Sequence, residues 1–102
     1  METSVFTKYL KTLLPDKDYR KLQNEIILNP EKGTIIRGSG GLRKLRWSIP
    51  GKGKSGGVRI IYYWAKPKEI ILMLLIYSKK EQDDLSNEQL KILKSLVEKE
   101  FK

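Results

Sequence analysis

Apolar residues in the first third of the chain have the spacing of two helices. They recur every three or four positions, in a first segment at Val5, Phe6, Tyr9, Leu10 and Leu13 and in a second at Tyr19, Leu22 and Ile26. Such spacing places side chains on one face of a helix. Pro15 separates the two segments, and Asn29-Pro30 ends the second because the residue before a proline disfavours helical backbone. We therefore predict two N-terminal helices.

The middle of the chain has the two-residue period of β-strands. Residues 34–36 are β-branched, and residues 42–49 and 58–64 alternate between the two faces of a strand. Residues 70–77 are apolar without interruption, which is typical of a strand buried on both faces. A glycine-rich loop at residues 50–57 joins the second of these segments to the third. We therefore predict four strands.

A third helix follows the strands. Ser86 and Gln89 have the spacing of a capping box, and an apolar stripe comes after them at Leu90, Leu93, Leu96, Val97 and Phe101. Two helices, a run of four strands and a helix indicate an α+β domain with a mainly antiparallel sheet. A chain of 102 residues has room for one such domain, residues 1–102. We expect the helices on one face of the sheet and the charged side chains on the other, open face.

Positive charge is concentrated in the strand region. The chain has 21 Lys and Arg against 12 Asp and Glu, a net charge of +9. No acidic residue lies between Lys32 and Lys68, whereas every glycine of the chain does. The basic residues of this stretch are Lys32, Arg37, Arg43, Lys44, Arg46, Lys52, Lys54, Arg59, Lys66 and Lys68. A solvated basic loop is the alternative, but cations without counter-charge repel one another, so the pattern favours an anion site.

Composition limits the chemistry. The chain has no cysteine and no histidine, so any acid–base step uses Lys, Tyr, Asp or Glu. Asp83-Asp84 precede the last helix, and we interpret them as carboxylates facing the helix dipole rather than as a metal motif. A metal site is the minority interpretation, because no third ligand lies nearby in the sequence. No secretory signal is evident, and the longest apolar run is far shorter than the ~20 residues of a membrane span, which indicates a cytoplasmic protein.

Alternation along the predicted strands groups several basic side chains. It places Lys44 and Arg46 on one face, and Arg59 on a face with Ile61 and Tyr63. In an antiparallel sheet, the start of strand 58–64 lies beside the end of strand 70–77. We therefore expect five side chains to converge on one surface: Lys44, Arg46, Arg59, Tyr77 and Lys80.

Such a surface suits the cleavage of RNA, whose own 2′-hydroxyl is the nucleophile. Arg and Lys stabilise the charge that develops on the phosphate, and a lysine crowded by other cations loses its proton more readily and acts as a base. Aromatic side chains hold bases by stacking, and the candidates are Trp47, Tyr62, Tyr63, Trp64 and Tyr77. Core packing is the expected role of Trp47 and of one residue of each adjacent pair.

Four strings occur in a distinctive order. They are Leu-Asn-Pro at 28–30, Gly-Ser-Gly-Gly-Leu-Arg-Lys-Leu-Arg at 38–46, Gly-Lys-Gly-Lys-Ser-Gly-Gly-Val-Arg-Ile-Ile-Tyr-Tyr at 51–63 and Ile-Tyr-Ser-Lys-Lys-Glu at 76–81. Through them the chain resembles the RelE/ParE superfamily of toxins, and within it the HigB-type branch most closely. The resemblance runs from the first helix to the last.

The resemblance implies a fold, an activity and partners. The fold is RelE-like, similar to that of microbial ribonucleases, and the resemblance implies neither a metal nor a cofactor. The activity is that of an mRNA interferase, a metal-independent endoribonuclease that cleaves translated mRNA in the A site of the 70S ribosome and so inhibits translation. The partner is a cognate antitoxin of the helix-turn-helix HigA type, which blocks the toxin and brings it to operator DNA.

The resemblance also suggests roles for single residues. Lys44 and Arg46 stand where these toxins have a basic pair, Arg59 where they have a phosphate-stabilising arginine, and Lys80 where a basic residue assists the leaving group. The RelE prototype has a tyrosine where this chain has Ser86, and Tyr77 is the candidate to replace it. The further RNA-binding candidates are Arg43, Lys52, Lys54, Lys79 and Tyr63.

The general base stays open between three lysines. The prototype has a lysine where Arg46 stands here, and a guanidinium is too strong a base to give up its proton. The alternatives are Lys44 and the loop residues Lys52 and Lys54.

Three other functions remain alternatives. A ParE-like toxin shares the fold but poisons gyrase. A non-catalytic RNA- or ribosome-binding module would lose affinity evenly as cations are removed, whereas a nuclease loses rate steeply at one or two positions. A membrane-surface protein is the least favoured, because the basic residues lie on strands and loops rather than along an amphipathic helix.

Overall fold

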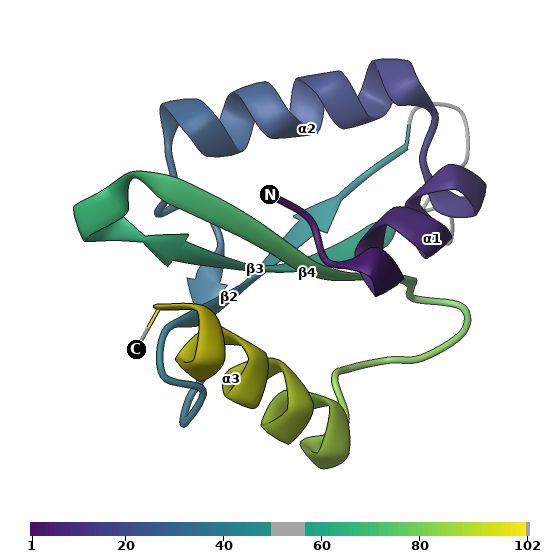
Figure 1. The fold of residues 1–102 in the computed structure, drawn as a ribbon. Coiled ribbons are helices and arrows are strands. Elements are labelled where there is room, and N and C mark those ends of the chain that lie inside the picture. Colours follow the sequence, from purple (N-terminus) through teal and green to yellow (C-terminus); the bar gives the residue numbers. More distant parts are fainter. Residues whose placement is uncertain (50–56, 102) are drawn as a thin grey trace.

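Helices flank a run of strands along the chain, in the predicted order (Figure 1). The computed structural model describes residues 1–49 and 57–101. Its elements are α1 (Ser4–Leu13), α2 (Asp16–Leu28), β1 (Thr34–Ile35), β2 (Leu42–Trp47), β3 (Val58–Ala65), the 3₁₀ turn η2 (Lys66–Lys68), β4 (Ile70–Ser78) and α3 (Asn87–Phe101). The α+β prediction is confirmed. Lys52 and Lys54 lie outside the described residues.

The four strands form one antiparallel sheet in the order β1-β2-β3-β4. Each strand therefore pairs with its neighbour in sequence, which needs only short connections. The β3–β4 register shifts between Ile61 and Tyr62, and a glycine-rich turn with positive φ at Gly38, Gly40 and Gly41 leads into β2. This register decides which side chains share a face near the functional site.

Helices cover both faces of the sheet, so the expectation of one open face is wrong (Figure 1). On one face, Phe6 of α1 and Leu22 of α2 pack in a core with Ile60. On the other face, Leu93 and Val97 of α3 pack in a second core. The physical reason lies in β4, whose side chains are buried on both sides from residue 72 to residue 77. A strand that is apolar on both faces needs cover on both.

The first helix buries less of its apolar surface than its spacing predicts. Phe6 is buried, whereas Val5 and Tyr9 are 47% and 46% exposed. Thr3 holds the start of α1 on β4, because its Oγ1 accepts from the Phe6 N–H and donates to the Leu74 carbonyl. The helix thus lies over the edge strand, where only one side of it meets the sheet. The predicted stripe of α2 is confirmed, since its three residues are buried.

Tyr62 fastens the segment after α2 to the sheet. Its buried hydroxyl donates to the Pro30 carbonyl at 2.7 Å and accepts from the Gly33 N–H at 2.9 Å. Gly33 has room for no side chain, because a Cβ there would lie 2.8 Å from the Tyr62 ring. Burial raises the pKa of Tyr62, so the phenol is neutral and able to donate.

We expect the substitution Tyr62→Phe to lower the free energy of unfolding by about 1–3 kcal/mol. The change removes one hydroxyl and leaves the Gly33 N–H buried without an acceptor. Urea unfolding followed by circular dichroism measures the effect, and Tyr9→Phe on the exposed side of α1 is the matched control. Equal stability of the two variants would contradict this account of Tyr62.

Candidate nucleic-acid interface

Three side chains form a row across neighbouring strands. Arg46 of β2 pairs with Arg59 of β3, and Arg59 pairs with Tyr77 of β4. Directly paired residues of an antiparallel sheet point to the same face, so all three side chains lie on the α3 side. Lys44 lies on the same face, two residues along β2 from Arg46. The predicted grouping of Lys44 with Arg46, and of both with Arg59 and Tyr77, agrees with this register.

The third helix leaves this end of the face accessible. The end of α3 lies over the far part of the sheet, where Phe101 contacts Tyr63 with ring centroids 5.5 Å apart. Arg46 is exposed and Arg59 is half-buried. The Arg46–Arg59–Tyr77 row is therefore a solvent-facing cationic surface with a buried tyrosine at one side.

Neither arginine makes an ion pair in the described part of the chain. Ion pairs within residues 1–49 and 57–101 join Lys32 to Glu25 and Lys44 to Asp84, and neither includes Arg46 or Arg59. Like charges directly opposite each other destabilise a sheet. An anion bound between the two guanidinium groups would offset that repulsion, and planar guanidinium groups match the geometry of phosphate.

Tyr77 has an unpaired hydroxyl buried next to this surface. The residue is 4% exposed, and its hydroxyl oxygen is buried with no hydrogen-bond partner in the described residues. Burial raises the pKa of Tyr77, the negative charge of Asp84 raises it further, and Arg59 opposes them. The phenol is therefore neutral at pH 7 and acts as a donor. Buried polar atoms rarely stay unpaired, and the exceptions are often at functional sites.

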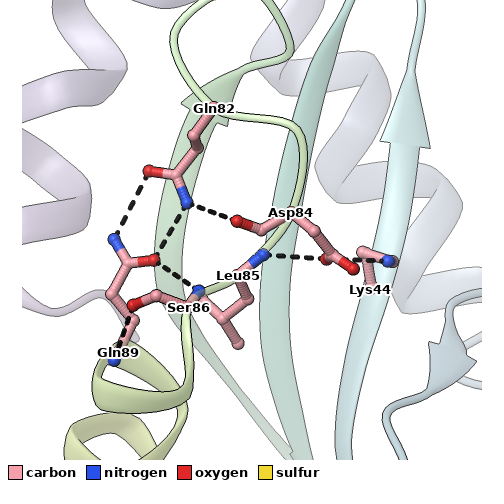
Figure 2. A network of polar contacts seen from close by, with 6 residues as sticks. All are labelled: Lys44, Gln82, Asp84, Leu85, Ser86 and Gln89. Atoms are coloured by element: carbon pink, nitrogen blue, oxygen red, sulfur yellow. Dashed lines mark hydrogen bonds and ion pairs between the residues drawn. The ribbon is translucent and has the colours of Figure 1, made fainter.

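Asp84 has a partner that its place before α3 did not predict (Figure 2). Its Oδ1 accepts from Lys44 Nζ at 3.0 Å and from the Leu85 N–H at 2.8 Å. The Lys44 hydrogen bond, followed by that of Leu85, lowers the pKa of Asp84. Ser86 and Gln89 form the predicted capping box, with Ser86 before α3 and Gln89 in its first turn, so the helix begins at Asn87. The carboxylate of Asp84 thus pairs with a cation of the sheet.

A cavity of about 380 Å³ opens beside this ion pair. Lys44 and Asp84 line it together with Arg37, Asn87 and Leu90, and segments from β1, β2 and the start of α3 enclose it. The cationic surface therefore continues into a hollow that carries both charged and apolar side chains.

A comparison with protein families identifies the chain. The model described as "RelE toxin of RelE / RelB toxin-antitoxin system" matches residues 2–102. The chain belongs to this toxin family. The RelE/ParE resemblance in the sequence is thereby confirmed, and its HigB-type subdivision stays a prediction. The α+β fold with one antiparallel sheet is consistent with a RelE toxin.

Other candidate residues of the toxin lie apart from the row. Arg43 points to the opposite face, where its Nη1 donates to the carbonyls of Glu31 at 3.1 Å and Gly33 at 2.8 Å. Arg43 thus supports the same segment as Tyr62 and is not brought to the RNA-binding candidates. Tyr63 shares the α3 face with the row, but its ring is half-buried against Phe101.

The two lysines after β4 are close to the row in sequence. Lys79 and Lys80 are exposed in the turn that follows Ser78, and the Lys80 N–H donates to Ser78 Oγ at 3.1 Å. This places Lys80 three residues beyond Tyr77. Trp47 lies on the α1–α2 face and packs partly buried against that core, as expected for a core residue.

The described residues contain neither a cluster of metal ligands nor a helix that could span a membrane. No cluster of three or more Asp or Glu side chains there has the arrangement of a metal site. In the same part of the chain, no helix combines the length and apolar character needed to cross a membrane.

Proposed function

We propose that this RelE-family toxin is an endoribonuclease that cleaves translated mRNA in the ribosomal A site. The observation that carries the proposal is the Arg46–Arg59 pair beside the unpaired Tyr77 hydroxyl. Two guanidinium groups without an ion-pair partner in the described residues bind a phosphate, and a neutral phenol donates to one of its oxygens. The net charge of +9 favours association with the ribosome and with mRNA.

The reaction needs few groups from the protein. The ribose 2′-oxygen attacks the adjacent phosphorus, its proton passes to a base, and the bond to the 5′-oxygen breaks as that oxygen takes a proton. The products are a 2′,3′-cyclic phosphate and a 5′-hydroxyl. In this scheme Arg46 and Arg59 stabilise the charge on the phosphoryl oxygens, and Tyr77 donates a hydrogen bond to one of them. Lys80 protonates the leaving oxygen, and the step needs no metal and no cofactor.

Control of this activity falls to an antitoxin. Membership of a toxin–antitoxin family implies a cognate antitoxin. We propose one of the HigA type, whose helix-turn-helix domain binds the operator and takes the toxin there. In this proposal the toxin acts in the cytoplasm, where mRNA is translated, as the one domain formed by residues 1–102.

Mapping the 5′ ends of cellular mRNA after brief expression from a tight promoter tests the proposal. We expect new 5′ ends inside translated frames, and we expect them to disappear when initiation of translation is blocked. Growth arrest with intact mRNA and damaged DNA would point to gyrase instead. Absence of both arrest and cuts would leave a non-catalytic RNA- or ribosome-binding module as the better account.

A further inference from the structure

We propose that Asp84 is a positioning residue of this site, which holds the ammonium group of Lys44 on the face of the sheet that carries Arg46 and Arg59. The inference rests on the proposed function, because it assigns Asp84 a place in the cleavage of RNA. Asp84 acts through Lys44 and makes no contact with the substrate in this scheme.

The contact between the two residues is long-range and directed. Lys44 and Asp84 are separated by 40 positions, and their Nζ–Oδ1 distance is 3.0 Å. The same Oδ1 accepts from the Leu85 N–H, which fixes the direction of the carboxylate. Neither Arg46 nor Arg59 makes an ion pair within the described residues, so Lys44 is the cation of this surface that Asp84 binds directly.

The segment that carries Asp84 is itself fixed by hydrogen bonds (Figure 2). The side-chain amide of Gln82 donates to the Asp84 carbonyl and to Gln89 Oε1, both at 2.9 Å. Gln89 Oε1 also accepts from the Ser86 N–H at 3.0 Å. The capping box of α3 and the preceding loop are thus one connected unit, and Asp84 is attached to it.

The energetics point to positioning rather than to folding. The side chains of Lys44 and Asp84 are 31% and 66% exposed, and ion pairs with such exposure contribute little to stability. A lysine side chain, in contrast, has a flexible four-carbon stem whose freedom must be lost before it stabilises a transition state. Holding the ammonium group in place beforehand raises the rate of the chemical step.

The pairing also bears on the role of Lys44. An ammonium group held by a carboxylate donates hydrogen bonds and has no lone pair with which to take a proton. This assigns Lys44 to the stabilisation of charge on the phosphate, and it leaves the general base to another group. The variant Lys44→Arg, which keeps the charge permanently, should then retain far more of the rate than Lys44→Met.

Single-turnover cleavage of mRNA on purified ribosomes tests the proposal. The variants are Asp84→Asn, Asp84→Glu and, as matched control, Asp83→Asn, each in the wild-type and the Lys44→Met background. Asparagine at position 84 keeps an oxygen that can accept from the Leu85 N–H, but it removes the negative charge of the carboxylate. We expect Asp84→Asn to lower the maximal single-turnover rate constant by about 10- to 100-fold, with little change in Tm or in the toxin concentration that gives half of that rate. Asp84→Glu should keep most of the wild-type rate constant.

The double variants separate positioning from a structural effect. If Asp84 acts through Lys44, Asp84→Asn has no further effect once Lys44 is methionine. An equal loss of rate in both backgrounds, or a Tm that falls in parallel with the rate, would overturn the proposal. Unchanged cleavage by Asp84→Asn would also overturn it while leaving the proposed function intact. A wild-type toxin that cleaves no mRNA would overturn the proposed function itself.

Discussion

Replacing Arg59 with alanine is expected to lower the rate of mRNA cleavage by about 10²- to 10³-fold, the range found when one donor to a charged transition state is removed. Arg59 lies at the centre of the Arg46–Arg59–Tyr77 row, paired with one residue on each side. Its guanidinium group is the one placed to share a phosphate with both neighbours. Arg59→Lys keeps the positive charge but loses the planar, two-pronged guanidinium group. Its cleavage rate should therefore lie between those of the wild type and Arg59→Ala.

The fold should not suffer from the same change. Removing one of two directly opposed arginines relieves a repulsion, which is worth roughly 0.2–1 kcal/mol in a sheet. We therefore expect the free energy of unfolding of Arg59→Ala to be unchanged or slightly raised while its activity falls. This opposition of activity and stability distinguishes a binding residue from a structural one.

Single-turnover cleavage and urea unfolding of the same preparations check both halves of the prediction. Arg20→Ala is the matched control, because Arg20 is an exposed arginine on α2, on the other side of the sheet. Cleavage by the Arg59 variant at the rate of the Arg20 variant would remove Arg59 from the site. An equal loss of rate in both variants, each with a shallower dependence on salt than the wild type, would indicate a general electrostatic effect.

The order of elements could be predicted from the sequence because periodicity is a local property. Each helix and strand has its own apolar spacing, and the predicted bounds differ from the structure by at most a few residues, as where β2 ends at Trp47 rather than at residue 49. The shared face of Lys44 and Arg46 follows from the same rule. An antiparallel register then suffices to bring Arg59 and Tyr77 together.

The covering of the sheet is a long-range property and was predicted wrongly. Nothing in the spacing of α3 says which face it covers. The signal that was available is the uninterrupted apolar run of β4, which was itself predicted to be buried on both faces. Such a strand is incompatible with an open face over its whole length. The charged surface is only the part of that face that α3 does not reach.

The Lys44–Asp84 pair had no signal in the sequence. The two residues come from β2 and from the loop before α3, and only the folding of α3 against the sheet brings them together. The contacts of Arg43, the neighbour of Lys44 in the sequence, also had no signal there. Strand alternation assigns the two to opposite faces, but only the structure shows that Arg43 binds the backbone of residues 31 and 33.

Replacing Tyr77 with phenylalanine should lower mRNA cleavage by about 10- to 100-fold without loss of stability. The substitution removes a neutral hydroxyl that is buried beside Arg59 and has no partner in the described residues. A buried hydroxyl without a hydrogen bond costs about 1–3 kcal/mol. Its removal should therefore leave the free energy of unfolding equal or raise it, while the phosphoryl oxygens lose one donor.

Tyr62→Phe is the matched comparison, because the two tyrosines are buried on neighbouring strands and differ in their hydroxyl groups. That of Tyr62 is paired with Pro30 and Gly33, and it lies on the face opposite the row. Tyr62→Phe should thus lose stability and keep cleavage, whereas Tyr77→Phe should keep stability and lose cleavage. If both variants cleave like the wild type, the Tyr77 hydroxyl has no part in the reaction. If Tyr77→Phe is the less stable of the two, its hydroxyl has a structural partner instead.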